Sequence, residues 1–441
     1  MVKIIIIDSI MGSGKTEAVL NMIRNDTEHK YFYVTPYLSE INRVAYSTYY
    51  RLKQPYQLGK GKLSSLHDLL REGADIVTTH ALFLMATAET EQLIRDGGYT
   101  LILDEALDVL REYNEIVKEL DGKVVKKDDV RWLIQEHIIS VDEMYKVTWE
   151  RSVADDFQFS EIVRMCQNGV LRCIDETLFW EFPVSVLNAF ENAYILTYQF
   201  QGTVFDSYLK LYGLEYDLLS AKRTGEDSFE LCPYADDLDI RYKKSKLITV
   251  YEGIYNEIGR KPYALSVTNL TNMSKEKISS MMKGMRNVKN YFRASSADLM
   301  ITTSMHNNFY LNLDQNGFKY IHKLSSAEMA LPEEELKKLR CFVPCNARAT
   351  NDFSDRNTAM YMLNKYPSPE IEKYFNRLGV PIDKDVYAKN ELTQWIWRSG
   401  IRKGEPIKLY LPSSRMRNLF YDWMGWYDTA EEATEEEEIE Q

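Results

Sequence analysis

Residues 4–16, IIIIDSIMGSGKT, decide the fold of this chain. The run of isoleucines is typical of a central parallel strand that is covered on both faces. Gly12 to Thr16 follow this run, and residues 15–25 then have the apolar spacing of a helix. Glycines let a backbone wrap closely around an anion, and the positive end of a helix attracts it. The stretch therefore predicts a strand, a phosphate-binding loop and a helix.

The glycine loop supplies the candidate nucleotide-binding residues. Lys15 is expected to reach the β- and γ-phosphates, and the Thr16 hydroxyl to bind Mg²⁺. The first glycine of the common eight-residue pattern is absent, so a chance match in an ordinary loop is the alternative. The candidate residues are Gly12, Ser13, Gly14, Lys15 and Thr16.

A second apolar run, residues 101–105 (LILDE), ends in two carboxylates. At the end of a parallel strand they would lie beside the phosphate loop. Asp104 can hold Mg²⁺ and Glu105 can polarise an attacking water. The alternative is an ordinary helix start with acidic residues in its first turn.

Strand-like and helix-like segments alternate along the first half of the chain, which predicts an α/β fold with a parallel sheet. Residues 105–190 are rich in charge, Trp and helix formers, and we expect a mainly helical insertion there, over about 106–190. The expected strands are 4–8, 31–35, 75–78, 100–104 and 193–197, and the expected helices include 15–25 and 38–53.

A second α/β pattern starts near residue 261. It predicts a helix over 274–286 and strands over 299–303, 341–345 and 407–411. At 441 residues the chain is long enough for two or three domains. We expect a first lobe over 1–245, a second over 246–427, and a tail over 428–441.

The formal net charge is −12, yet much of it lies in the tail. Removing the eight acids of residues 428–441 leaves −4, so a basic groove on the body remains compatible with the composition. The tail itself is low in complexity and is expected to be disordered. It is a solubilising end, or else a docking peptide or a mimic that screens a nucleic-acid groove.

Two function classes find no support in the sequence. No apolar run approaches the roughly 18 residues that span a bilayer, and residues 1–8 do not resemble a signal peptide. The five cysteines form no CxxC pair, which argues against a zinc site and indicates reduced thiols.

Residues 394–402, QWIWRSGIR, form a third constellation. Gln394, Arg398 and Arg402 lie four residues apart, so on a helix they would share one face. Arginines on such a face can act as fingers on a transferring phosphoryl group. The alternative is a solvated basic face with Trp395 and Trp397 as packing residues.

Together the three constellations resemble the superfamily 2 DEAD/DEAH-like helicases, and the segment 346–416 looks closest to helicases encoded by bacteriophages. Gly12 to Thr16 match motif I, Asp104 to Leu107 match motif II, and Gln394 to Arg402 match motif VI. Arg402 stands one residue late, and Trp397 replaces a glycine. The resemblance implies two RecA-like lobes in tandem with these catalytic residues: Lys15, Asp104, Glu105, Gln394, Arg398 and Arg402.

Weaker motifs follow in the family's order, including Leu196 to Tyr198 in place of motif III. Each taken alone also fits an ordinary turn or cap residue. The residues that the resemblance implies for nucleic-acid binding are Thr35, Tyr37, Arg43, Thr79, His80, Thr303, Asn346 and Arg348.

The resemblance implies an ATPase that uses ATP and Mg²⁺ to move along single-stranded or forked nucleic acid, with DNA favoured. The setting would be phage replication, recombination or repair in the bacterial host cytoplasm, with no membrane partner. A replication or single-strand-binding protein could dock on the acidic tail. The family's upstream adenine motif has no room before Asp8, so ATP is inferred from the family alone. A DNA-packaging motor and a nucleotide-dependent binding module without unwinding are the alternatives.

Overall fold

The computed structural model describes residues 2–57, 61–119, 122–151, 159–226, 228–236, 238–295, 297–304, 341–345 and 353–426. The acidic tail, Asn346 and Arg348 lie outside these residues. The described chain forms two compact units. Unit 1 comprises residues within 1–9, 13–235 and 367–383, and unit 2 comprises those within 10–12, 236–366 and 384–441.

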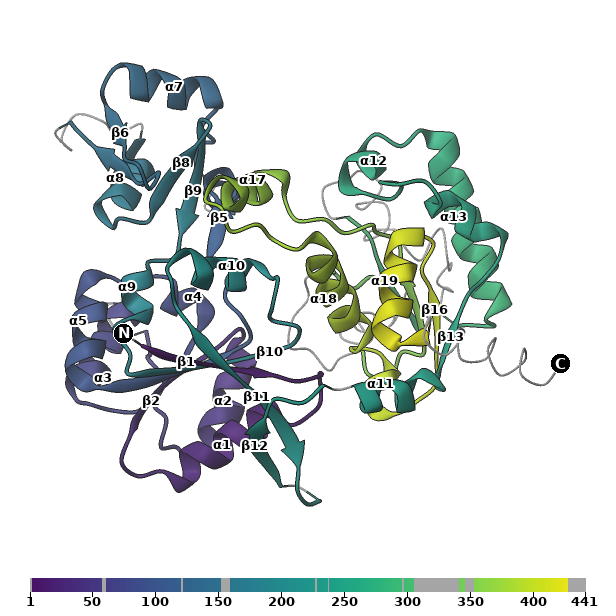
Figure 1. Ribbon diagram of the computed structural model, residues 1–441, viewed down its shortest axis with the longest axis horizontal. Helices are drawn as coiled ribbons and strands as arrows, with labels where there is room; N and C mark the ends of the chain where they lie inside the picture. The colour runs from purple at the N-terminus through teal and green to yellow at the C-terminus, as the bar shows by residue number, and fades with distance from the viewer. Residues whose placement is uncertain are drawn as a thin grey trace. The chain divides into compact units, whose positions relative to one another are not determined.

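A seven-stranded sheet forms the centre of unit 1 (Figure 1). Its order is β12-β11-β1-β10-β4-β2-β3, and every neighbouring pair is parallel except β11 with β12. The expected parallel α/β fold is confirmed. The strands are β1 (Lys3–Asp8), β2 (Lys30–Thr35), β3 (Ile76–Thr79), β4 (Tyr99–Asp104), β10 (Asn192–Thr197), β11 (Tyr216–Arg223) and β12 (Phe229–Pro233).

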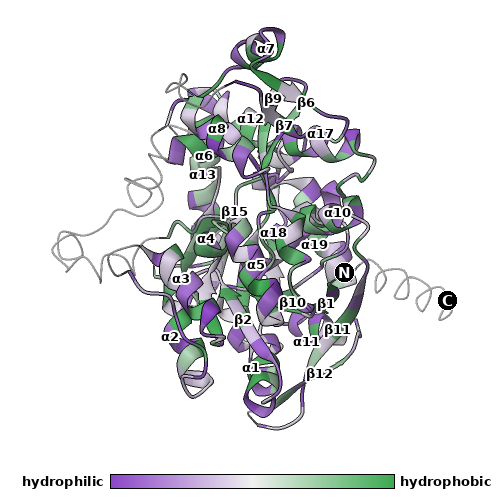
Figure 2. Ribbon diagram, turned by 90° about the vertical axis from the view of Figure 1, so that its left-hand side faces the viewer, coloured by the Kyte–Doolittle hydropathy of each residue, from purple (hydrophilic) through white to green (hydrophobic). Residues whose placement is uncertain are grey.

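Amphipathic helices pack against this sheet, and several carry both hydrophilic and hydrophobic residues in Figure 2. Helix α2 was expected over 38–53 but ends at Ser47. The chain turns there because Tyr49 and Tyr50 adopt positive φ angles of 53° and 57°. The helices are α1 (Lys15–Asn25), α2 (Leu38–Ser47), α3 (Lys62–Arg71), α4 (His80–Phe83), α5 (Ala88–Gly97) and α10 (Val204–Leu211).

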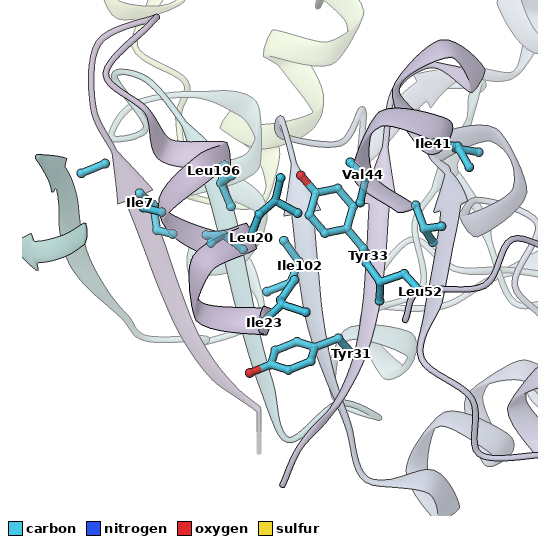
Figure 3. Packing of buried hydrophobic residues seen from close by; sticks show 14 residues of the cluster. Ile7, Leu20, Ile23, Tyr31, Tyr33, Ile41, Val44, Leu52, Ile102 and Leu196 are labelled. Carbon is cyan, nitrogen blue, oxygen red and sulfur yellow. The ribbon is translucent and has the colours of Figure 1, made fainter. Parts of the chain in front are cut away.

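The core beside the glycine loop lies between α1 and the sheet (Figure 3). Leu20 and Ile23 of α1 meet Ile7 of β1 and Ile102 of β4, and all four side chains are fully buried. Each such burial stabilises the fold by about 1.5–3 kcal/mol. This packing holds the start of α1 against the ends of the central strands.

The insertion combines helices with two small antiparallel sheets, one of order β5-β9-β8 and one of β6 and β7. Its helices fit the mainly helical character that we expected, while its strands are too short to stand out in a charged sequence. The elements are β5 (Leu110–Glu112), α6 (Tyr113–Glu119), α7 (Lys127–Gln135), β6 (Ile139–Val141), β7 (Val147–Trp149), α8 (Ser160–Gln167), β8 (Leu171–Ile174), β9 (Thr177–Glu181) and α9 (Val184–Leu187).

A four-stranded parallel sheet of order β13-β16-β15-β14 forms the centre of unit 2. The strand expected at 341–345 is reduced to an isolated bridge between Phe342 and Ile301. The strands are β13 (Ile248–Val250), β14 (Leu299–Thr302), β15 (Thr358–Tyr361) and β16 (Ile407–Tyr410). The helices are α11 (Leu238–Ser245), η3 (Ile254–Gly259), α12 (Val267–Thr271), α13 (Lys275–Tyr291), α18 (Lys384–Ile396), η4 (Gly400–Lys403) and α19 (Ser414–Met424).

Helix α17 (Pro369–Arg377) packs in unit 1, although its sequence lies between β15 and α18 of unit 2. Tyr374 donates a hydrogen bond to the buried Glu181 carboxylate at 2.5 Å, and Arg172 pairs with the same carboxylate at 2.8 Å. A segment that we expected inside the second lobe is therefore held by the insertion of the first. Among the helices of the described ranges, none has the length and apolar character that a bilayer crossing requires.

Candidate functional site

The glycine loop joins β1 to α1 with two residues in left-handed backbone conformations. Gly12 has a φ angle of 82° and Gly14 one of 90°, which side chains rarely tolerate. Gly14 is also the N-cap of α1, and having no side chain it makes no capping hydrogen bond to the first helical turn. The buried Ser13 hydroxyl has no hydrogen-bond partner within the described residues. Both features suit an anion in the loop.

Lys15 and Ser9 form hydrogen bonds that hold the two ends of the loop in place. The Lys15 ammonium donates a hydrogen bond to the Ser9 carbonyl oxygen. The Ser9 N–H donates to the Thr197 carbonyl at 3.3 Å, and the Ser9 hydroxyl accepts from the Ala221 N–H at 3.0 Å. Ser9 therefore ties the end of β1 to both neighbouring strands, and the loop starts from a rigid point.

Asp104 lies at the end of β4, next to the start of α1. The Thr16 hydroxyl donates to its Oδ1 at 3.4 Å and the Tyr33 hydroxyl to its Oδ2 at 2.9 Å. Burial raises the pKa of Asp104, although the Tyr33 hydrogen bond and the Arg43 charge oppose the rise. A hydroxyl and a carboxylate in contact behind a phosphate loop are suitable donors for Mg²⁺.

Glu105 follows Asp104 in a strained backbone conformation. Its φ angle is 71°, and its N–H donates to the Leu196 carbonyl at 3.1 Å. A non-glycine residue in this region costs about 1–3 kcal/mol and is common at functional sites. The hydrogen bond to β10 holds Glu105 in place directly after the candidate metal ligand.

Two further contacts connect the strand ends around the loop. His80 Nε2 lies 3.0 Å from the Asp104 carbonyl oxygen, so the start of α4 contacts the end of β4. The buried Asp8 carboxylate accepts hydrogen bonds from the N–H groups of Gln199 at 2.8 Å and Phe200 at 2.9 Å. The segment that follows Thr197 is thereby coupled to the segment that precedes the loop.

The residues expected to bind nucleic acid have varied surroundings. Thr79 caps α4 through the Leu82 N–H at 3.3 Å, in line with the ordinary alternative reading. Tyr37 is exposed, whereas Thr35 is fully buried. Arg43 forms ion pairs with Glu40 at 2.7 Å and Glu17 at 3.0 Å.

In unit 2, the buried Thr303 hydroxyl donates to the Met362 carbonyl at 3.2 Å. Its contact is therefore with the protein backbone. Asn346 and Arg348 lie outside the described residues.

The helical face expected for Gln394, Arg398 and Arg402 is wrong, because α18 ends at Ile396. Ser399 turns the chain, its hydroxyl donating to the Ile396 carbonyl at 2.6 Å, and Arg402 lies in the separate helix η4. Gln394 donates to the Asn390 side chain on α18. Arg398 is buried and Arg402 is exposed, so the two arginines have different environments.

The structure thus brings Lys15, Thr16 and Asp104 together in unit 1. Sequence reasoning missed Asp8 and Tyr33. Asp8 carried a signal, since it is an acidic residue at the end of an apolar strand. Tyr33 carried none, because a tyrosine within a buried strand is most often simple packing.

Fold and site define an α/β protein with two parallel-sheet units and a strand–glycine loop–helix element. One curated relative, the SPbeta prophage-derived uncharacterized protein YonV of Bacillus subtilis (strain 168), is 34% identical over 448 residues. The alignment covers 96% of this chain and 99% of the relative. A family model, the YonV C-terminal Rossmann-like domain, matches residues 242–424. The chain therefore belongs to the YonV family.

Solved structures give more distant matches. The S. tokodaii Xpd4 structure is 12% identical, with a TM-score of 0.45 over 95% of this chain and 93% of that chain. A structure of XPD helicase is 12% identical, with a TM-score of 0.42 over 96% and 94% of the two chains. At these levels the matches do not assign a reaction to this chain.

Proposed function

We propose that this protein is an ATP-dependent helicase or translocase that hydrolyses ATP with Mg²⁺ and moves along single-stranded nucleic acid, with DNA favoured. One observation carries the proposal: the Thr16 hydroxyl lies 3.4 Å from the Asp104 carboxylate at the end of the glycine loop. A hydroxyl and a carboxylate are the two ligands with which an ATPase of this kind would hold the metal of a metal–nucleotide complex.

The proposed roles follow from the position of each side chain. The Gly12 to Thr16 loop and the Lys15 ammonium would bind the phosphates. Thr16 and Asp104 would hold Mg²⁺, which neutralises developing charge on the phosphates when bound. Glu105, directly after Asp104, would polarise the attacking water.

The roles of the second unit rest on the motif VI resemblance. Arg398 would stabilise the charge of the transferring phosphoryl group, with Gln394 and Arg402 in support. Nucleotide chemistry would belong to the lobe 1–245, and the arginines to the lobe 246–427. The prophage origin of the YonV relative supports a phage setting in the bacterial host cytoplasm.

The test is ATP turnover in the presence of single-stranded DNA, single-stranded RNA, or no nucleic acid. We expect stimulation by single strands and most by DNA. Lys15→Ala should abolish turnover, and Arg398→Ala should abolish it while nucleotide binding is largely kept. A turnover rate that is the same with and without every polynucleotide would exclude a nucleic-acid motor. Nucleotide binding without turnover would instead indicate a binding module.

A further inference from the structure

We propose that the hairpin of β11 and β12 carries the nucleobase site, with the Phe229 ring and the Arg223 guanidinium stacking against a purine base. This inference rests on the proposed function, because it requires a nucleotide whose phosphates lie in the Gly12 to Thr16 loop. It adds a base-recognition element that none of the motifs in the sequence contains.

The Phe229 ring lies directly on the phosphate loop. A Cβ atom added to Gly14 would overlap the Cδ1 and Cε1 atoms of this ring. The ring is therefore in contact with the loop backbone immediately before Lys15. A base attached to phosphates in this loop has an aromatic surface within reach.

The hairpin is held firmly in that position. β12 pairs antiparallel with β11 at the edge of the sheet, where Phe229 is opposite Arg223. Asn21 of α1 donates a hydrogen bond from Nδ2 to the Phe229 carbonyl at 3.3 Å. Figure 1 shows β12 beside α1. The same helix that begins at the loop therefore positions the ring.

Arg223 adds a second stacking group to the hairpin. Its guanidinium lies 5.8 Å from the centre of the Phe229 ring. Arg223 Nε donates to the Gly225 carbonyl at 2.9 Å, and Nη2 donates to the Glu226 carbonyl. Aromatic rings and guanidinium planes are the two side-chain surfaces on which bases stack. A purine offers the larger surface for both.

Simple packing accounts for only part of this arrangement. Phe229 and Leu231 both pack against the core beneath α1, but Phe229 is also in contact with the loop and remains partly exposed. Among the described residues, this hairpin places an aromatic ring against the loop backbone at Gly14.

The experiment compares the affinities of ATP and inorganic tripolyphosphate, both with Mg²⁺, by competition with a fluorescent nucleotide. Phe229→Leu keeps an apolar side chain and removes the ring. We expect it to weaken ATP binding by roughly five- to one-hundred-fold, the range for loss of one stacked base. Tripolyphosphate affinity should change less than about twofold, because its contacts are with the loop alone.

Matched variants separate stacking from packing. Leu231→Ala weakens the same strand and core, and we expect it to leave the ratio of ATP to tripolyphosphate affinity unchanged. Phe229→Trp should keep ATP binding. Arg223→Gln should weaken ATP without affecting tripolyphosphate.

Three outcomes would overturn the inference. Equal loss of ATP and tripolyphosphate in Phe229→Leu would mean that the ring only supports the loop. Unchanged affinity for both would mean that the base lies elsewhere. Wild-type protein that binds neither would remove the proposed function together with the inference. If the wild type binds both ATP and tripolyphosphate and Lys15→Ala binds neither, the phosphate site of the proposed function is supported independently of the hairpin.

Discussion

Tyr33 of β2 donates a hydrogen bond at 2.9 Å to the Asp104 carboxylate at the end of β4. The two residues are 71 positions apart in the chain and meet because β2 and β4 are parallel neighbours. Burial raises the pKa of the Tyr33 phenol well above its usual value. The hydroxyl therefore stays protonated and keeps its proton available for the hydrogen bond to Asp104. Tyr33 thereby orients the carboxylate that we propose as a metal ligand.

Replacing this donor should affect metal use. In Tyr33→Phe we expect Asp104 to lose its orientation, so that half-maximal ATP turnover requires more Mg²⁺ and stability falls by about 1.5–3 kcal/mol. Titration of turnover with Mg²⁺ and urea unfolding measure the two effects. Tyr99→Phe is the matched control, since Tyr99 donates to the Ala74 carbonyl at 2.9 Å away from the loop. An identical Mg²⁺ dependence in both variants would contradict a positioning role for Tyr33.

Gly14→Ala should damage the loop for two reasons that can be separated. The left-handed backbone costs about 1–2 kcal/mol, and the clash with Phe229 adds about 1–3 kcal/mol. Gly213→Ala is the control, because its φ angle is 61° and nothing lies within 4 Å of the added Cβ. Urea unfolding should show a larger loss for Gly14→Ala, together with loss of nucleotide binding. Equal losses would mean that Phe229 moves aside without cost.

Asp26 predicts a specific pH dependence of stability. Burial acts to raise its pKa, but hydrogen bonds from Tyr31, the Glu28 N–H and His29 outweigh this and lower it well below 3.8. A carboxylate with a lowered folded pKa stabilises the fold above its unfolded pKa, and this contribution is lost as the pH falls through the folded pKa.

Asp26→Asn should therefore be less stable than the wild type at pH 7, by about 1–3 kcal/mol. The difference should begin to shrink once the pH falls below about 4. Urea unfolding at pH 7 and pH 3 measures it. A difference of the same size at both pH values would show that the charge of Asp26 is unimportant.

Helix α17 should depend on the Glu181 carboxylate. In Glu181→Gln the buried carboxylate is lost and the partly buried Arg172 has no counter-ion there, so we expect stability to fall by about 3–5 kcal/mol. Tyr374→Phe removes one hydrogen bond to the same carboxylate and should cost about 1.5–3 kcal/mol. During limited proteolysis, both variants should be cleaved within residues 367–383 faster than the wild type. Tyr421→Phe is the control, because it loses only an exposed hydrogen bond to Glu252. We expect neither a comparable loss of stability nor faster cleavage in this variant.

The most accurate sequence predictions concern segments whose structure follows from local pattern. Helix α1 was expected over 15–25 and is observed as Lys15–Asn25, and the strand expected at 193–197 is observed as Asn192–Thr197. The helical face expected through Arg402 failed, because the chain turns at Ser399 and Gly400. Spacing alone could not show that turn, since four-residue spacing also occurs without a helix.

The sequence by itself determined the elements around the glycine loop, because apolar periodicity and glycine act over a few residues. It also placed Lys15 at the start of a helix, and Asp104 and Glu105 at the end of a buried strand. Only the tertiary structure decided the contacts of Asp104 with Tyr33 and of Gly14 with Phe229. It alone also assigned α17 to unit 1. These relationships depend on strand order and chain crossover, which bring together residues far apart in the sequence and leave no local pattern behind.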